Sequence, residues 1–593
     1  YLYTNNNFYT KAYQMGNNGA MNTNRPASFN NTKDIQFITN AFLQFKKNMN
    51  GHSLTVFAGG EFFEFQRYVS SGFAQGAPTD LIPWLVASTP PSVIGTTINN
   101  PAGASSNFSA WERLASGIAR VNYDYKNRYL LTGIVRMDGS SRLSSGNFYE
   151  VFPGVSLGWN MHNEDFYDKL GINKYVSSFK PRFSYGVNGN INSLGYYATE
   201  QIYNSAGTYN GLGGTYAASY INSDLRWERT NTLNFGADIG FNKDRIILNA
   251  DYYIRNVYDK LASLPISSQT GFTGYTTNLG QLQNRGIEIA VNARIIEEKS
   301  NRGFSLDAGA NFSHVKSYAI KLPYNGLPGN RQGTMQVWDP NNPGQLMQVG
   351  GLIEGKRIGL DEVWAPSWNG MYTSQGEIDK ESGVYNAFLP YNNKRIKQLG
   401  DARWHQVNKN DTIDSRQFVY VGRTTPQYVG GFNVSSGYKG FRLYAGFDYS
   451  FGFVIMNNEI VRGLSQVQGS QNSTSDVLNT WSPTNTTGTM PRYYWANQGR
   501  NYATDASGNN PAAQLWEKGD YVMVREVTLA YDVNAEFLSR QLKNAIKGIS
   551  LYVTGSNLAY ISGYSGNFPE FGGVDQGKYP LPRRLTIGAR VTL

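Results

Sequence analysis

TLNFGADIGFNKDRIILNADYYIRN, residues 232–256, contains two candidate strands joined by a three-residue connection. In its first half, the apolar residues Leu233, Phe235, Ala237, Ile239 and Phe241 alternate with Thr232, Asn234, Gly236, Asp238 and Gly240. A period of two is typical of a β-strand with one apolar and one polar face. The short connection 242–244 then leads into a second strand, so the pattern predicts an antiparallel hairpin.

The same alternation recurs along the whole chain, often over about ten residues, the length that lets a tilted strand cross a bilayer. The fifteen candidate strands lie at about 33–48, 51–66, 112–125, 128–137, 152–161, 179–189, 230–241, 245–256, 285–296, 303–314, 427–437, 440–451, 520–533, 548–557 and 583–593. A sixteenth is expected within Tyr1–Tyr13.

Short and long connections alternate in chain order. The short ones include 126–128, 242–244 and 438–440, and the long ones are expected at about 190–229, 257–284, 315–426 and 452–519. Outer-membrane barrels have tight periplasmic turns and long extracellular loops, whereas a soluble sandwich has no reason for this asymmetry. The sequence therefore predicts an all-β fold, a transmembrane antiparallel β-barrel, of which this chain supplies about 15–16 strands.

Composition agrees with a barrel. Aromatic residues make up 14% of the 593 residues and charged residues 16%, with 64 glycines and no apolar run of about 18 residues that would form a membrane helix. The absence of cysteine excludes thiolate metal sites and disulfides. The net charge of +10 comes from dispersed Lys and Arg, so we expect no nucleic-acid partner, and the sequence indicates no cofactor.

Several short segments stand out in order along the chain: RMDGSSRL (136–143), FPGVSLGW (152–159), SYGVNGN (184–190), LRWERT (225–230), NRGIE (284–288), TPQYVGGF (425–432) and YPLP (579–582). Together they resemble the SusC/RagA family of TonB-linked outer-membrane transporters. The resemblance implies a bacterial outer-membrane protein with a 22-strand barrel and an N-terminal plug. It further implies TonB-dependent import of oligosaccharides or peptides together with a SusD-like surface lipoprotein.

On this basis residues 1–593 are expected to be the C-terminal part of such a barrel. The plug domain, the first strands and the contact with the TonB complex are expected to lie outside this sequence. A passive outer-membrane adhesin or structural barrel is the alternative. A membrane hydrolase is disfavoured because His52, His162, His314 and His405 are scattered along the chain, so no enzyme activity is expected.

One segment resembles a calcium-binding loop of the family but lacks its carboxylates. In residues 406–414, QVNKNDTID, the candidate ligands are Asn408, Asn410 and Asp414, and Asp411 stands where a glycine would allow a sharp turn. Calcium prefers several carboxylates, so we expect this loop to be empty.

The only candidate ligand-binding residues are aromatic side chains in the expected extracellular loops, whose rings can stack on sugars or pack on peptide side chains. They are Trp84, Trp364, Trp368, Trp404, Trp481, Tyr493, Tyr494, Trp495 and Trp516. The alternative is that each ring packs inside a loop or contacts a lid protein.

Alternation also predicts which strand residues face lipid, because a charge at the bilayer centre is costly. The predicted inward set is Lys180, Arg182, Asn234, Asp238, Glu288, Arg294, Arg442 and Asp448. The predicted outward set is Phe183, Tyr185, Leu233, Phe235, Ile289, Val291, Leu443 and Phe447.

Overall fold

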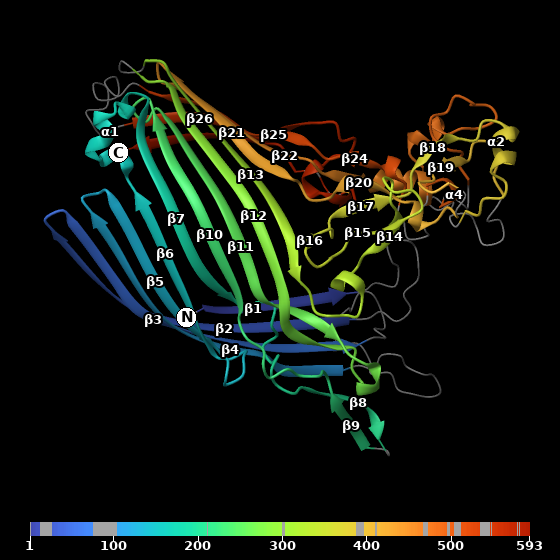
Figure 1. The fold of residues 1–593 in the computed structure, drawn as a ribbon, viewed down its shortest axis with the longest axis horizontal. Helices are drawn as coiled ribbons and strands as arrows, with labels where there is room; N and C mark the ends of the chain where they lie inside the picture. Colours follow the sequence, from blue (N-terminus) through green and yellow to red (C-terminus); the bar gives the residue numbers. More distant parts are fainter. Residues whose placement is uncertain are drawn as a thin grey trace. The chain divides into compact units, whose positions relative to one another are not determined.

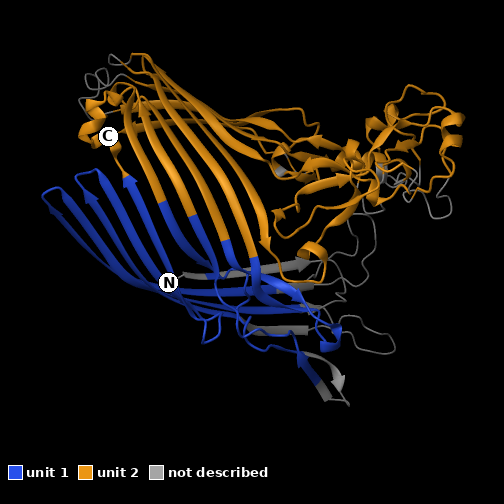
Figure 2. Cartoon of the chain, in the orientation of Figure 1, with its two compact units in different colours: residues 1–158, 184–232, 257–280 blue, residues 159–183, 233–256, 281–593 orange. Residues whose placement is uncertain are grey.

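The structure is a computed structural model of the chain, drawn in Figure 1. It describes residues 2–11, 27–74, 103–209, 212–298, 303–386, 396–409, 412–466, 473–494, 499–502, 511–533, 546, 548–577, 579 and 581–592. The chain forms two compact units, coloured in Figure 2. Unit 1 comprises 1–158, 184–232 and 257–280, and unit 2 comprises 159–183, 233–256 and 281–593.

Unit 1 is built on an antiparallel ladder in which β1 to β5 pair in chain order. Its strands are β1 (Leu2–Lys11), β2 (Ala27–Met49), β3 (His52–Ala74), β4 (Gly103–Tyr125), β5 (Tyr129–Ser140), most of β6 (Tyr149–Trp159), and the hairpin β8 (Tyr203–Tyr209) and β9 (Leu212–Ala217). Asn50 and Gly51 both have positive φ, as a two-residue turn between right-twisted strands requires.

Unit 2 is built on a second antiparallel ladder, which runs β12, β13, β21, β22, β25, β26 and β28. These strands are β12 (Gly274–Ile296), β13 (Ser305–Lys321), β21 (Tyr428–Tyr438), β22 (Phe441–Phe451), β25 (Tyr521–Asp532), β26 (Gly548–Ser562) and β28 (Arg584–Thr592). β7 (Val176–Asn190), β10 (Glu228–Phe241), β11 (Ile246–Pro265) and β12 contribute residues to both units.

All fifteen predicted strands are present, and β1 confirms the sixteenth within Tyr1–Tyr13. One predicted connection is wrong: β11 continues to Pro265 and β12 already begins at Gly274, so 257–284 is not a long loop. Beyond the bilayer neither face of a strand must be apolar, so backbone pairing continues where the hydropathy pattern has ended. β2, β3 and β4 extend to 23 residues each in the same way.

The strand registers of unit 2 separate a polar face from an apolar face. Arg294 pairs with Asp307, Asp307 with Ser435, and Ser435 with Tyr444, which places Arg294 on the same face as Arg442 and Asp448. Glu288 pairs with Ser313, Ser313 with Val429, and Val429 with Ser450. Glu288 therefore lies on this polar face as well. Ile289, Val291, Leu443 and Phe447 lie on the opposite, apolar face, as predicted.

Side-chain contacts follow the same division. On β7, Arg182 donates to Asp238 at 2.9 Å and to Asp251 at 3.0 Å, whereas the neighbouring Phe183 ring lies 5.3 Å from that of Phe235. Buried or confined charges need such partners, while an apolar face that meets lipid needs none. The two faces are therefore suited to water on one side and hydrocarbon on the other.

A pair of neighbouring substitutions tests this division on β21. Val434 lies on the apolar face opposite Ala445, and Ser435 lies on the polar face opposite Asp307. Val434→Lys is expected to cost roughly 2–4 kcal/mol, because it places a charge near the bilayer centre. Denaturant unfolding in lipid vesicles measures this loss. Ser435→Lys is the matched control and should stay within about 1 kcal/mol of the native protein; equal costs for both would contradict the assignment of faces.

The connections 322–427 and 452–520 contain most of the short elements (Figure 1). Their strands are β14 (Met335–Trp338), β15 (Leu346–Val349), β16 (Lys356–Arg357), β17 (Glu362–Ala365), β18 (Trp368–Met371), β19 (Ala402–Trp404), β20 (Val419–Arg423), β23 (Val454–Asn457) and β24 (Trp516–Lys518), and β27 (Gly573–Asp575) follows β26. The α-helices are α1 (Asp165–Lys169), α2 (Gln375–Lys380), α3 (Asn458–Val461) and α4 (Gly499–Tyr502). Among the described residues no helix has the length and apolarity needed to cross a membrane.

Candidate functional site

The two long connections of unit 2 fold together into one packed body, which we call the loop body and define as the described residues of 322–427 and 452–520. Its core draws on both connections: Trp368, Ala402, Trp404, Ile413, Met456, Val461, Leu464, Tyr502, Ala512 and Leu515. The Trp368 ring meets those of Trp404 and Tyr502 edge-on, with centroids 5.9 and 6.1 Å apart. This packing fixes the loops relative to each other.

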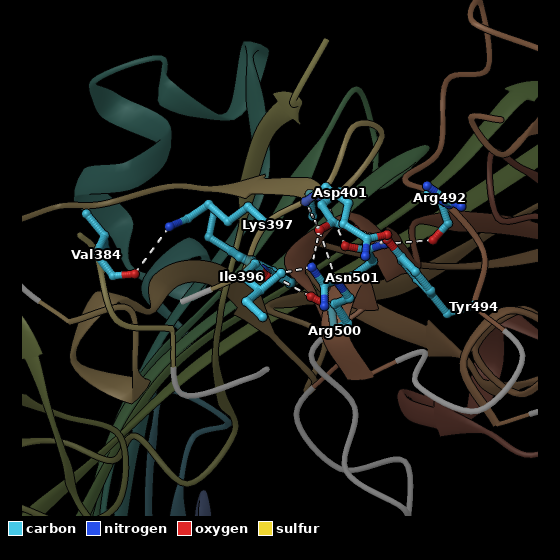
Figure 3. Close-up of polar contacts among 11 residues, drawn as sticks. Val384, Ile396, Lys397, Asp401, Arg492, Tyr494, Arg500 and Asn501 are labelled. Carbon is cyan, nitrogen blue, oxygen red and sulfur yellow. Dashed lines mark hydrogen bonds and ion pairs between the residues drawn. The ribbon is translucent and has the colours of Figure 1, made fainter. Parts of the chain in front are cut away.

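A buried ion pair at the centre of Figure 3 joins the two connections. Asp401 is 3% exposed and Arg500 is 5% exposed. Arg500 donates from Nε at 2.9 Å and from Nη2 at 2.6 Å to Asp401 Oδ2, while the Tyr494 hydroxyl donates to Oδ1 at 2.7 Å. Asn501 adds a longer contact to Oδ1 at 3.4 Å. Both carboxylate oxygens are thus satisfied, as a buried charge requires.

Lys397 and Glu381 extend this network within the first connection. The Lys397 ammonium donates to the backbone carbonyls of Glu381 and Val384, and burial lowers its pKa. The Tyr372 hydroxyl donates to Glu381 Oε2 at 2.6 Å, and burial together with this hydrogen bond raises the pKa of Tyr372. These groups hold the fold of the loop body, and each is engaged by neighbours of the same chain.

The loop body places the predicted ligand-binding rings in different surroundings. Trp368, Trp404 and Trp481 are buried, with exposed fractions of 9%, 4% and 7%. Trp364, Tyr493, Tyr494 and Trp516 are partly exposed. Trp84 and Trp495 lie outside the described residues. The surface available to a ligand therefore belongs to the second group, and the first group contributes mainly to loop packing.

Gly400 was not identified from the sequence, yet it shapes this region. Its φ is +84°, and a Cβ there would come within 2.1 Å of the Trp481 ring. The Arg492 guanidinium lies 6.0 Å from the Trp481 ring centroid and 5.2 Å from that of Tyr494. In the sequence, the only signal for this close approach is the glycine itself, which stands directly before Asp401.

The calcium-like segment uses its polar groups internally. Asp414 accepts from the Arg416 backbone at 2.9 Å and pairs with the Arg416 guanidinium, also at 2.9 Å. The buried Gln417 amide donates to the carbonyls of Asn408 and Thr412. Asn410 lies outside the described residues, and in the part of the chain that is described no three His, Asp or Glu side chains gather to hold a metal ion.

The four histidines have separate local partners. His52 contacts the Tyr123 hydroxyl at 2.7 Å, His162 accepts from the Phe179 backbone, His314 contacts the Gln427 carbonyl at 2.6 Å, and His405 contacts Asn369. These contacts are to tyrosine, asparagine and backbone groups rather than to a serine or threonine nucleophile.

Motif residues in unit 1 form a second buried polar cluster. Glu228, from LRWERT, is 3% exposed and accepts from Asn190, from the Leu261 backbone at 2.8 Å and from Lys260 at 3.4 Å. Arg142, from RMDGSSRL, pairs with the buried Glu112 at 2.6 Å. These motifs therefore support the strand ends of the sheet.

The polar face of the unit 2 ladder holds a cavity of about 540 Å³. Its wall includes Asp307, Arg442, Glu526, Thr528, Tyr552 and Arg590. Further along the same face, Arg525 binds Asp448 at 2.6 Å and Glu570 at 2.9 Å. Mixed charges and hydroxyls make this face suitable for water or a polar molecule.

Comparisons with known proteins identify relatives over most of the chain. TonB-dependent receptor P3 of Formosa agariphila is 27% identical over 589 residues, which are 95% of this chain and 53% of that protein. TonB-dependent receptor P26 of the same organism is 27% identical over 97% of this chain and 54% of its own length. TonB-dependent receptor SusC of Bacteroides thetaiotaomicron is 26% identical over 93% of this chain and 49% of its own length. The chain spans about half the length of these relatives.

Solved structures agree on the fold. The RagAB peptide importer in its open-open state superposes with a TM-score of 0.74 at 21% identity, covering 100% of this chain and 58% of that one. A second RagAB structure gives 0.72 at 22% identity, covering 99% and 59%. No protein-family model matches the chain. The two-faced strands, the ordered motifs and these relatives agree: the chain is similar in sequence to TonB-dependent receptors, SusC among them, and shares the outer-membrane β-barrel fold of the RagAB importer.

Proposed function

We propose that this chain forms barrel strands of an importer that carries oligosaccharides or peptides across the outer membrane at the expense of TonB-coupled energy. The observation that carries the proposal is the polar face of unit 2, with its cavity of about 540 Å³ on the side opposite the apolar face. A lining of charged and hydroxyl side chains supports passage of polar cargo, because it offers hydrogen bonds without a continuous apolar surface.

The contact with TonB and the plug domain belong, in this proposal, to a part of the protein outside these 593 residues. The support is that the curated relatives are about twice as long as this chain. The first strands of a 22-strand barrel would come from the same part. Strand edges in lipid leave backbone groups unsatisfied, so strands at the limits of a partial sheet need such partners.

A SusD-like lipoprotein is the proposed partner at the loop body. Several large apolar side chains of the 322–427 connection are exposed, including Tyr324 at 76%, Leu360 at 69% and Leu327 at 47%. Exposed apolar surface of this kind favours contact with another protein. The partly exposed rings Trp364, Tyr493 and Tyr494 are the proposed ligand-contacting residues of the loop body.

Uptake by cells that carry the complete gene tests the proposal. Labelled oligosaccharides and labelled peptides are supplied separately, to cells with and without TonB and to cells with and without the SusD-like lipoprotein. We expect one substrate class to accumulate, and accumulation to fall at least about tenfold when TonB is removed, because movement against a gradient needs the coupled energy. Accumulation that is unchanged without TonB would contradict import and favour a passive adhesin or structural barrel.

A further inference from the structure

On β13 the apolar face of unit 2 ends in an aromatic row, and basic residues follow. Phe312, His314 and Lys316 follow one another on this face. Phe312 pairs with Ile289 and His314 pairs with Ile287, and both isoleucines lie on the apolar face of β12. The Tyr428 ring stacks near those of Phe312 and His314, with centroids 6.1 and 4.9 Å away. Tyr428 begins β21, whose other end is Tyr438 at the turn 439–440.

The two tyrosines mark the limits of the membrane-facing band. Aromatic residues flank an apolar band roughly 25 Å tall in outer-membrane barrels, and long connections lie on the extracellular side. The connection 322–427 precedes Tyr428, so this end is extracellular. Lys316 is two residues beyond His314 on the same face and therefore lies at the level of the outer-leaflet headgroups.

A cavity of about 400 Å³ opens at this level and lies entirely within unit 2. Its wall includes His314, Lys316, Arg357, Tyr428, Lys518 and Asp520. Arg357 reaches the same face because it pairs with Tyr318, four residues after His314. Tyr420, from β20, completes the wall on the loop side. The cavity is thus formed by strands and loops together.

The wall carries more positive than negative charge. Within the described part of the chain, Lys316 and Lys518 have no ion-pair partner, and Arg357 donates to the neutral Gln427 amide. Among the residues that the structure describes, Asp520 is the one carboxylate in the wall, and it already accepts from the Gly452 backbone at 2.6 Å. Arg423, also in the wall, is neutralised by Asp361 and Glu362. Three cations therefore face one occupied carboxylate.

We propose that this cavity binds the phosphate of an outer-leaflet glycolipid headgroup. Ammonium and guanidinium groups are the usual partners of phosphate oxygens, and basic pockets at the membrane surface bind anionic headgroups. The ligand is a lipid rather than transported cargo, because the cavity continues the apolar face and the polar cavity lies on the opposite one. The site orients the barrel in the leaflet and is independent of the proposed import.

Native mass spectrometry of the complete transporter in nanodiscs tests this assignment. The probes are a phosphorylated lipid A, its dephosphorylated form and inorganic phosphate. The native protein is expected to retain phosphorylated lipid A at least about tenfold more than the dephosphorylated form. The double variant Lys316→Gln and Lys518→Gln should lose that preference, and Lys316→Arg with Lys518→Arg should restore it, which separates loss of charge from misfolding.

Lys47→Gln is the matched control. Lys47 is exposed on β2 beside the turn 50–51, on the same face as Phe45, and should leave retention unchanged within about twofold. Equal retention by the native protein and the double glutamine variant would overturn the proposal. Saturable binding of inorganic phosphate that lipid A does not displace would overturn the lipid assignment and leave a site for free phosphate.

Discussion

Arg500→Leu is expected to open the loop body, with a loss of about 3–5 kcal/mol of local stability, because it leaves the Asp401 carboxylate buried and unpaired. Arg500 supplies the positive charge and two short contacts to Asp401 Oδ2, which also accepts from the Gln398 backbone at 2.7 Å, and the Arg500 side chain is 5% exposed. Hydrogen exchange followed by mass spectrometry measures the effect. Protection should fall in residues 396–404 and 499–502 and remain unchanged in the strands of unit 2.

Two variants give this experiment its controls. Arg403→Leu removes an ion pair with Glu381, which is only 22 residues away in the sequence. Because Arg403 is 42% exposed, the cost should be no more than about 1 kcal/mol. Adding Asp401→Asn to Arg500→Leu should recover part of the lost protection, because the uncompensated charge is removed. Unchanged exchange in Arg500→Leu would show that the pair does not hold the two connections together.

Trp404→Ala is expected to cost about 3–5 kcal/mol by leaving a cavity in the core of the loop body. Its ring is 4% exposed, packs against Trp368 and donates from Nε1 to the Arg500 carbonyl at 3.3 Å. Hydrogen exchange should therefore rise across both connections, and any loss of substrate binding should follow that opening.

Trp364→Ala provides the comparison for a ring with exposed surface. Trp364 donates to Glu362 Oε2 at 3.1 Å and meets Tyr420 edge-on at 5.4 Å, at the margin of a smaller core. If it contacts substrate, its removal should weaken binding while protection of the loop body is retained. Normal protection in Trp404→Ala together with lost binding would instead assign Trp404 to the ligand.

The strands of this protein could be predicted from sequence because lipid imposes a period of two on them. β10, β22 and β28 each have one apolar and one polar face, and the pattern locates them to within a few residues. The signal weakens where strands leave the bilayer. Asp259 on β11 has a positive φ of 52°, and the surrounding polar residues hide a strand that continues to Pro265.

The loop body could not be predicted in the same way. Asp401 and Arg500 are 99 residues apart, and nothing local to either residue indicates the other. Aromatic residues in loops can be recognised, but their position does not distinguish Trp404, which is buried, from Trp364, which is partly exposed. That distinction depends on which distant segments pack together, and a single sequence carries no period or spacing for it.

A cysteine scan across β22 tests the two-faced membrane strand most directly, because these 593 residues contain no native cysteine and any cysteine elsewhere in the protein can be replaced by serine. Single cysteines at 442–448 of the complete protein, in its membrane, are labelled with a spin probe. Positions 443, 445 and 447 should respond to oxygen dissolved in lipid, and positions 442, 444, 446 and 448 to a water-soluble relaxation agent. Equal response of neighbouring positions, or the reverse pattern, would contradict the account of this chain as an outer-membrane barrel.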